Sequence, residues 1–368
     1  MHVECLREET LKDVVDLIKE RFGRGGLDAL YRNMGNPLRR NFPVAGYIVI
    51  EKETPIAFEA VILRKVYIGV RECIGRVGGL TCIKEGAPAE AIVDIRTAEK
   101  NGLGLTGAKI CLCFANSQCR ETAAMSVRSR GEAGPDSCRE IRERRIRKFR
   151  WFCLRVRYWL QRVRRKCFKI GLSKKTWPAF DTRSNANYAI SVGNFAIRRL
   201  MGFDEAVFNG LMSRYLKTNQ GLVLSRTSDE LNWLFGTRVQ AGSAVLLGAF
   251  DKDEIVGYII VDGGQSARRW RIVDWFALKN DMRILEPLLS AACRFLKEKT
   301  PAITLCSEGF PTFVQPLLGK YLPHKTMRSY SVFTWGCGKD KAFREELEKI
   351  IDTPSSWFFG PYDGDACY

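Results

Sequence analysis

Two residues of the chain, Asp274 and Tyr330, have the type and the setting to take part in proton transfer. The chain contains only two histidines, so a Ser/His or Cys/His nucleophile pair would have to use His324. A zinc site built on several imidazoles is excluded, and the 13 cysteines contain no Cys-x-x-Cys pair, so the sequence predicts no metal site. General acid and base chemistry would therefore fall to carboxylates and tyrosines.

Asp274 stands inside the apolar run from Ile272 to Phe276. A carboxylate buried in such a strand needs a charged or hydrogen-bonding partner, or a chemical task. Tyr330 begins the last predicted strand, where its phenol could serve as an acid. The alternative for Tyr330 is packing in the core or at the edge of the sheet.

A second feature is the segment from Arg139 to Lys175, which concentrates the positive charge of the chain. It holds 16 Lys and Arg residues against two Glu residues, so it carries +14 of the formal net charge of +18. Apolar residues recur in it at spacings of three and four, which predicts a long basic amphipathic helix. The residues that would bind an anionic surface are Trp151, Arg155, Arg157, Tyr158, Arg162 and Arg165.

Three partners for this helix are open. Its apolar stripe could pack on a neighbouring domain while its arginines are solvated. It could also lie on anionic lipid headgroups, with its aromatic rings at the headgroup level. Nucleic acid such as tRNA is the third option, because arginines interleaved with aromatic side chains suit phosphates and stacked bases.

Length and composition predict a globular chain of two domains. The chain has 368 residues, of which 46% are apolar and 27% charged. Its first twenty residues are charged and amphipathic, and 13 cysteines without a signal peptide indicate a reducing compartment. No window reaches the roughly 18 apolar residues that a transmembrane helix needs. We therefore expect a cytoplasmic protein that meets a membrane, if at all, peripherally at the inner face.

The elements that would position these residues follow from hydrophobic periodicity and turn residues. In the first half they are a helix at Glu8–Phe22 closed by Gly23, strands at Ala45–Glu51, Ile56–Lys65 and Val77–Ile83, a helix at Ala89–Glu99, a strand at Lys109–Phe114 and a helix at Asn116–Arg128. In the second half they are helices at Phe203–Lys217 and Ser228–Phe235, strands at Ala244–Phe250, Ile255–Asp262 and Arg271–Phe276, a helix at Ile284–Lys297, a strand at Ile303–Cys306, a short helix at Phe313–Leu318 and a strand at Tyr330–Trp335.

The two halves share this order of elements. The strand, turn and strand that begin at Tyr47 match those that begin at Leu246, with Ile56 and Ile255 at corresponding places. The sequence therefore predicts two copies of one α+β domain, at residues 1–138 and 176–368, joined by the basic helix at residues 139–175.

This order resembles that of the GNAT superfamily of acyl-CoA-dependent N-acyltransferases. The stretch GAFDKDEIVGYIIV from Gly248 resembles the second and third strands of that fold. Leu30 to Pro37 and Leu231 to Phe235 resemble the segment that precedes the hairpin in tandem members. The resemblance covers both halves and implies two GNAT-like domains, each with a mixed, mostly antiparallel sheet flanked by helices. Fem-type peptidyltransferases, which use aminoacyl-tRNA, have a related tandem arrangement.

The resemblance also implies where an acyl-CoA such as acetyl-CoA would bind. In the family, a loop of the type Q/R-x-x-G-x-G/A follows the central strand, and backbone N–H groups at a helix N-terminus hold the pyrophosphate. Lys84, Gly86, Ala87 and Ala89 stand in register with that loop, which lacks the second glycine, and Asn116 stands where the family often has an asparagine near the cofactor. The alternatives are a plain turn at Gly86 and a helix N-cap at Asn116.

Acyl transfer to an amine needs a base and an acid. Glu85, beside this loop, is a candidate base, Tyr330 is a candidate acid, and Asp274 is the third catalytic candidate. The alternative for Glu85 is an ordinary acidic residue at a helix start. The corresponding loop of the second half, Leu278 to Leu285, contains no glycine, so we expect that the second half does not bind coenzyme A in the usual way.

The resemblance thus implies an N-acyltransferase that moves an acyl group from acyl-CoA to an amine. The basic helix suggests that this amine lies on an envelope or polysaccharide precursor near the membrane. Two other functions stay open: a Fem-type ligase that uses aminoacyl-tRNA, and a binding protein whose GNAT-like folds have lost catalysis, which the incomplete loop allows.

Overall fold

The computed structural model of the chain divides into two compact units. The first comprises Met1–Arg139, Met212–Leu234 and Arg328–Tyr368, and the second comprises Glu140–Leu211 and Phe235–Met327. The structure describes residues 1–6, 11–98, 108–116, 141–145, 182–264, 268–307, 312–326 and 330–336 and positions 343, 345 and 358, except positions 43, 89, 92, 96 and 220. Each unit therefore combines stretches that are far apart in the sequence.

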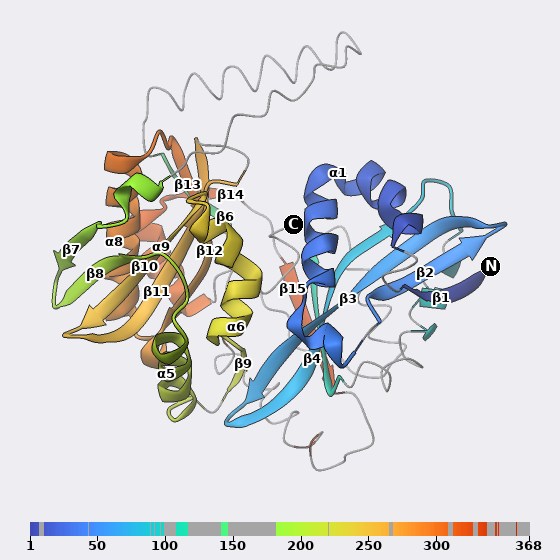
Figure 1. Ribbon diagram of the computed structural model, residues 1–368, viewed down its shortest axis with the longest axis horizontal. Helices are drawn as coiled ribbons and strands as arrows, with labels where there is room; N and C mark the ends of the chain where they lie inside the picture. Colours follow the sequence, from blue (N-terminus) through green and yellow to red (C-terminus); the bar gives the residue numbers. More distant parts are fainter. Residues whose placement is uncertain are drawn as a thin grey trace, which may run out of the picture. The chain divides into compact units, whose positions relative to one another are not determined.

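A seven-stranded sheet forms the first unit (Figure 1). In spatial order its strands are β1 (His2–Leu6), β2 (Gly46–Glu51), β3 (Thr54–Ile68), β4 (Arg71–Ile83), β5 (Ile110–Asn116) and β15 (Tyr330–Gly336), and β9 (Leu222–Leu224) pairs with the end of β3. The described pairs are antiparallel except β4 with β5, which run parallel. A parallel pair needs a crossover connection, and a helix described at residues 90, 91, 93–95, 97 and 98, named helix 90–98, lies in that connection.

Helix α1 (Lys12–Met34) is longer than the sequence predicts. Gly23 and the Gly-Gly pair that follows it predict a break, yet α1 continues and ends at Gly35. An interior glycine costs a helix about 1 kcal/mol. Val14, Ile18 and Leu30 of α1 are fully buried in one hydrophobic cluster with the sheet, and this packing outweighs the local preference.

The sheet of the first unit is buried on both faces. Phe58 and Ile62 of β3 pack in the cluster that contains α1, whereas Val61 and Leu63 pack in a second cluster that contains Ala91 of helix 90–98. Successive side chains of a strand point to opposite faces of the sheet. Helix α1 therefore covers one face, and helix 90–98 covers the other.

An eight-stranded sheet forms the second unit. In spatial order its strands are β14 (His324–Thr326), β6 (Ile141–Arg145), β13 (Thr304–Ser307), β12 (Arg269–Ala277), β11 (Glu254–Asp262), β10 (Ala244–Asp251), β8 (Phe195–Leu200) and β7 (Ala189–Val192). The described pairs are antiparallel except β12 with β13. The long helix α8 (Met282–Lys299) buries Leu285, Leu288, Ala292 and Phe295, a spacing of three and four that places them on one helical face.

The remaining helical segments are short, apart from α5. They are η1 (Pro37–Arg40), η2 (Arg183–Asn185), α5 (Glu205–Leu216), α6 (Ser228–Leu231), η3 (Asn232–Gly236), α7 (Thr237–Gln240), η4 (Leu278–Asn280), η5 (Thr312–Val314) and α9 (Gln315–Tyr321). Segments α6 and β9 lie in the second half of the sequence but belong to the first unit.

The expected basic helix is wrong at its start. Ile141–Arg145 form strand β6, which pairs antiparallel with β13 and with β14. Strand β13 needs a ladder partner on the side away from β12, and the hydrogen bonds that β6 makes there override the local helical pattern. The rest of the segment from Arg139 to Lys175 lies outside the described residues.

Two multi-strand mixed sheets with helices confirm the predicted fold class. Strands β10, β11 and β12 and helix α8 begin and end within two residues of their predicted bounds. The hairpin of β7 and β8 is missing from the prediction, although the Gly193-Asn194 pair between them is a hairpin turn signal. That the two halves are repeats stays a prediction.

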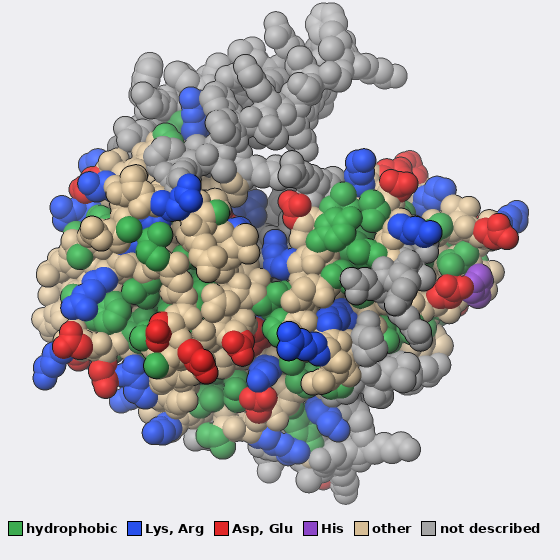
Figure 2. All heavy atoms as spheres, viewed as in Figure 1, with side chains coloured by type: hydrophobic (Ala, Val, Ile, Leu, Met, Phe, Trp, Pro, Cys, Tyr) green, Lys and Arg blue, Asp and Glu red, His purple; other side chains and the backbone are tan. Residues whose placement is uncertain are grey.

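Charged side chains of both signs are interspersed over the visible face of the described residues (Figure 2). Most of the excess positive charge of the chain belongs to the segment from Arg139 to Lys175. In the part of the chain that the structure describes, no helix is both long and apolar enough to cross a membrane.

Candidate functional site

Strands β4 and β5 of the first unit are parallel neighbours over only three residue pairs, of which the last joins Val77 to Leu112. Beyond this pair, β4 continues to Ile83 and β5 continues to Asn116. Within the described strands the two share no further ladder pairs, so their facing edges carry backbone N–H and C=O groups that this ladder does not use. A ligand with amide groups can be held between such edges.

A β-bulge interrupts β4 along the same stretch. The register between β3 and β4 shifts between Phe58 and Ala60. The single residue Glu59 therefore stands opposite two residues of β4, Leu80 and Thr81. A bulge leaves one residue without a ladder partner and bends its strand, which suits the divergence of β4 from β5.

The turn after β4 contains four of the predicted residues. The Lys84 N–H donates to the Ile56 carbonyl oxygen at 2.8 Å and continues the ladder with β3, and the Ala87 N–H donates to the Lys84 carbonyl oxygen at 3.1 Å. Gly86 has φ +81°, a left-handed conformation that favours glycine, and a Cβ added to it would meet nothing within 4 Å. Lys84 and Glu85 are exposed. The turn is therefore open to an anion.

Helix 90–98 follows this turn in the chain. Pro88 lies just before it, and the Ala91 N–H donates to the Pro88 carbonyl oxygen at 3.1 Å. Ala91 and Ile95 are fully buried against the sheet and fix the helix there. The predicted residue Ala89 lies outside the described residues.

Three side chains satisfy the edge of β3 where β2 has ended. Asn33 donates to the Val61 carbonyl oxygen at 3.1 Å, and Asn36 donates to the Leu63 carbonyl oxygen at 2.7 Å. The Arg39 guanidinium also donates to the Val61 carbonyl oxygen. These contacts explain the Asn-Met-Gly-Asn-Pro sequence physically, because a buried strand edge needs donors for its carbonyl groups.

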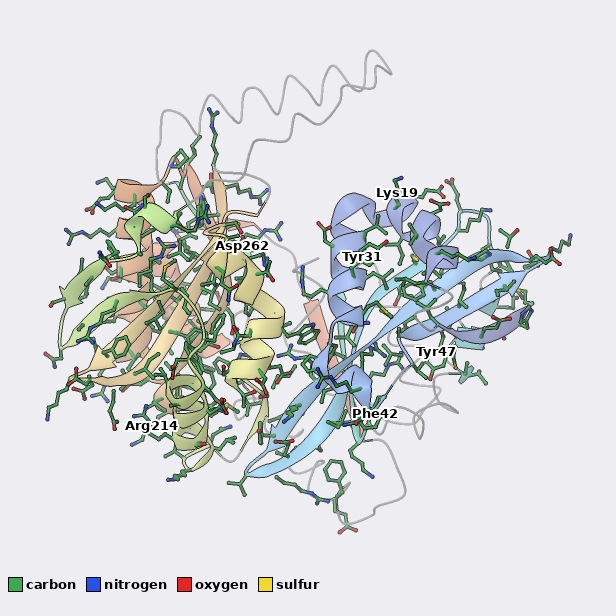
Figure 3. All side chains as sticks on the ribbon, in the orientation of Figure 1. Lys19, Tyr31, Phe42, Tyr47, Arg214 and Asp262 are labelled. Atoms are coloured by element: carbon green, nitrogen blue, oxygen red, sulfur yellow. The ribbon has the colours of Figure 1, made fainter. Side chains whose placement is uncertain are left out.

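A buried charge pair lies on the face of the sheet that helix 90–98 covers. The Glu59 and Arg76 side chains are 1% and 2% exposed, and Arg76 Nη2 lies 3.6 Å from Glu59 Oε1. The Arg76 guanidinium lies 5.9 Å from the centre of the Tyr47 ring on β2. Tyr47 is labelled in Figure 3. Burial and the neighbouring Arg76 lower the pKa of Arg39 to about 10.

The second unit has a similar backbone arrangement. Strands β12 and β13 run parallel over four residue pairs, the last of which joins Ile272 to Ser307. The register between β11 and β12 shifts so that Val273 has no partner, which places a bulge next to Asp274. Both central strands thus carry a bulge and a short parallel neighbour.

Asp274 has the partner that its burial requires. Its side chain is 1% exposed and accepts a 2.7 Å hydrogen bond from the Tyr258 hydroxyl. The Tyr258 ring stacks on Phe276, with ring centres 6.1 Å apart. This contact explains the burial of the Asp274 carboxylate without a chemical task.

The turn after β12 differs from the turn after β4. Lys279 and Asn280 have positive φ values of 56° and 55°. Asp281 caps α8, since its carboxylate accepts from the Arg283 N–H at 2.8 Å. The side chain of Arg283 also donates to this carboxylate, and that hydrogen bond is the main reason why the pKa of Asp281 is lowered. The N-terminus of α8 is therefore already occupied by a carboxylate of the protein.

Asn116 is the last residue of β5 and not the start of a helix, so the expected helix boundary there is wrong. Its backbone is in register with Tyr330, the first residue of β15, because the two strands pair antiparallel. Asn116, Tyr330 and Glu85 belong to the first unit, whereas Asp274 belongs to the second. The residues predicted for an anionic surface lie outside the described residues; they are Trp151, Arg155, Arg157, Tyr158, Arg162 and Arg165.

Glu59 and Arg76 are site residues that the sequence patterns above do not single out. The signal that marks Asp274 marks them as well, because each is a charge within an apolar strand. Among the described residues, no group of three or more His, Cys, Asp and Glu side chains could hold a metal ion.

No family model matches the sequence, and no curated protein matches it. Similar solved structures exist. A GCN5-related N-acetyltransferase from Kribbella flavida is 12% identical with a TM-score of 0.55, and the match covers 90% of this chain and 70% of that one. A probable N-acyltransferase of unknown function from Enterococcus faecalis is 11% identical with a TM-score of 0.53, covering 95% and 73%. The N-myristoyltransferase of Saccharomyces cerevisiae with bound myristoyl-CoA is 12% identical with a TM-score of 0.52, covering 90% and 79%.

At these identities the similarity shows the fold alone. The chain has a fold shared by GCN5-related N-acetyltransferases and N-myristoyltransferase. The predicted resemblance to the GNAT superfamily is confirmed at the level of the fold. A relation to Fem-type enzymes stays a prediction.

Proposed function

We propose that the chain is an acyl-CoA-dependent N-acyltransferase and that its first unit binds the acyl-CoA. The observation that carries the proposal is the divergence of β4 and β5 after Val77, next to the open turn at Gly86, in a chain whose fold is shared with acyl-CoA enzymes. Fold alone does not establish activity, so the proposal depends on this site.

The turn after β4 supports the binding of a pyrophosphate. Gly86 has no side chain to keep an anion away from the backbone. The exposed Lys84 adds a positive charge, and the N-terminus of helix 90–98 adds a partial one. We assign Lys84, Gly86, Ala87 and Ala89 to the pyrophosphate of coenzyme A.

The diverging strands support the binding of the pantetheine arm, whose amide groups can pair with the edge of β4 that its ladder with β5 does not use. The bulge at Leu80 and Thr81 lies on the same strand. A backbone N–H released from the ladder there is suited to polarise a thioester carbonyl group. Asn116, at the end of β5, completes the set that we assign to the acyl-CoA.

Acyl transfer requires a base for the amine and an acid for the leaving thiolate. We assign the base to Glu85, whose carboxylate is exposed beside the turn, and the acid to Tyr330, whose backbone pairs with Asn116. Asp274 stays a third candidate, although its hydrogen bond to Tyr258 already accounts for its burial.

A matched pair of glycine variants tests the proposal. Gly86→Asp adds a negative charge to the assigned pyrophosphate turn. Gly193→Asp makes the same change at a glycine of the second unit, which also has positive φ and open space around its Cβ position. Acetyl-CoA at 100 times its Kd should stabilise the wild-type chain by about 2.7 kcal/mol in thermal unfolding. The same shift is expected for Gly193→Asp and a much smaller one for Gly86→Asp.

The proposal fails if millimolar acetyl-CoA leaves the unfolding temperature of the wild-type chain unchanged. It also fails if both glycine variants respond as the wild type does. Release of free thiol from acetyl-CoA in the presence of an amine panel then reports transfer. Salt-sensitive tRNA binding without any response to acyl-CoA would support the Fem-type alternative instead.

We further propose that the acceptor amine is on an envelope or polysaccharide precursor near an anionic membrane surface. The charge of the segment from Arg139 to Lys175 supports this idea, since each Lys or Arg near an anionic surface adds about 1 kcal/mol. Flotation with phosphatidylserine-containing vesicles should be lost when Arg155, Arg157, Arg162 and Arg165 are changed to serine. Equal flotation of both proteins would contradict it.

A further inference from the structure

We infer that the buried pair of Glu59 and Arg76 limits the acyl group accepted by the first unit to short chains. The inference rests on the proposed function, because it places the thioester where β4 and β5 diverge. It concerns a pair of side chains that neither the turn at Gly86 nor the assigned acid and base include.

The pair lies beside the point of divergence. Arg76 is in register with Cys111, one residue before the last ladder pair between β4 and β5. Its guanidinium extends toward Glu59, which stands opposite the bulge of β4. Between Arg76 and the bulge, β4 contains Val77, Gly78 and Gly79, and the two glycines have no side chains.

Two other directions from the point of divergence are filled by described residues. Within the sheet, the three ladder pairs from Gly75 to Val77 join β4 to β5. On the face covered by α1, Val77 and Ile110 are 5% and 0% exposed in the same hydrophobic cluster as the helix. A long chain that extends toward these described residues would have to displace this packed core or the charge pair.

Displacing the charge pair is unfavourable for a hydrocarbon. Methylene groups form no hydrogen bonds with a guanidinium or a carboxylate. Separating the two groups in the interior would leave each charge without its partner, which is strongly unfavourable. An acetyl group ends before this obstacle arises, whereas a chain of many carbons meets it.

Binding of an acyl-CoA series to the full chain tests the inference. Acetyl-, butyryl-, octanoyl- and myristoyl-CoA are titrated by calorimetry, with free coenzyme A as the reference for the shared part of the ligand. We expect the affinity to fall at least about tenfold from acetyl-CoA to myristoyl-CoA, a difference of about 1.4 kcal/mol. Equal or tighter binding of myristoyl-CoA would overturn the inference.

A double variant tests the role of the pair directly. Glu59→Leu with Arg76→Met replaces both charges by apolar groups of similar volume, a change that interiors often tolerate. The ratio of myristoyl-CoA affinity to acetyl-CoA affinity should rise about tenfold or more relative to the wild type. If the variant folds and binds acyl-CoA but the ratio is unchanged, the pair does not set chain length.

The first unit also offers a matched control. Arg64 and Glu230 form a second buried ion pair, at 2.5 Å with exposures of 3% and 7%. Arg64→Met with Glu230→Leu removes the same charges away from the bulge and should keep the wild-type ratio. If the Glu59 and Arg76 variant does not fold, the wild-type series of acyl-CoA chain lengths still tests whether the first unit prefers short acyl groups. If the wild-type chain binds neither coenzyme A nor any member of the series, the proposed function is refuted, and the inference with it.

Discussion

The two units differ most where their central strands end. In both units a bulged strand has one short parallel neighbour and leads to a helix. After β4 the turn exposes Gly86, with nothing near its Cβ position, whereas after β12 the carboxylate of Asp281 occupies the N-terminus of α8. The same arrangement of strand, turn and helix can therefore leave the helix N-terminus open to an external anion or cap it with a carboxylate of the protein.

The units also bury polar groups differently. Among its described residues, the first unit buries the ion pairs of Glu59 with Arg76 and of Arg64 with Glu230. At the corresponding strand the second unit buries Asp274 with the Tyr258 hydroxyl as its donor. A buried ion pair contributes little net stability but is costly to break, whereas a hydrogen-bonded carboxylate costs less to disturb. We therefore expect a larger loss of stability from breaking an ion pair of the first unit than from removing the hydrogen bond to Asp274 in the second.

The largest effect is expected in the first unit for Arg64→Ala. The variant leaves the carboxylate of Glu230, whose side chain is 7% exposed, without its ion-pair partner. Its free energy of unfolding should fall by about 3–5 kcal/mol in urea titrations. The control is Arg64→Met with Glu230→Leu, which should be close to the wild type. A loss below about 1 kcal/mol for Arg64→Ala would contradict this account, because it would show that the pair contributes no more than a solvent-exposed ion pair does.

A smaller effect is expected in the second unit for Tyr258→Phe. The variant removes the 2.7 Å hydrogen bond to Asp274 and keeps the ring that stacks on Phe276. A hydrogen bond to a charged group contributes about 1.5–3 kcal/mol, and urea unfolding should report a loss in this range. Tyr188→Phe is the matched control, because the Tyr188 hydroxyl lies 3.5 Å from its acceptor, the Ala291 carbonyl oxygen. Equal losses for both variants would contradict the assignment.

The smallest effect is expected for Asp281→Ala, which removes the cap of α8. Loss of an N-cap costs about 1 kcal/mol at neutral pH. The pKa of Asp281 is lowered from 3.8 mainly by the side chain of Arg283, so its contribution is present above that pH. The contribution is lost as the pH falls through the lowered pKa. Urea midpoints of the wild type and the variant should therefore differ at pH 7 and converge below about pH 3.8; a constant difference would contradict this account.

Most regular elements of the second half could be predicted from the sequence. Strands β10, β11 and β12 are nearly continuous apolar runs bounded by charged turns, and α8 has an apolar stripe. Elements whose pattern is weak or too short were missed, among them β1 and β14. Helix α1 shows the opposite error, since its glycines predict a stop that packing overrides.

The candidate site could be predicted only in part. The turn at Gly86 follows from local sequence, because a glycine between a strand and a helix is visible as a pattern. The pair of Glu59 and Arg76 joins residues on two strands, and the bulge that sets their offset has no local signature. Glu59 and Arg76 can be recognised as a pair only from the register between β3 and β4.

The sequence by itself determined the class of elements, the apolar faces and the concentration of charge between Arg139 and Lys175. These features depend on the order of neighbouring residues. The tertiary structure alone decided which strands pair, including β15 with β5 and β6 with β13, and that Glu230 reaches Arg64 across 166 positions. Such pairings depend on which distant groups can satisfy a buried edge or a buried charge, and local periodicity carries no information about that choice.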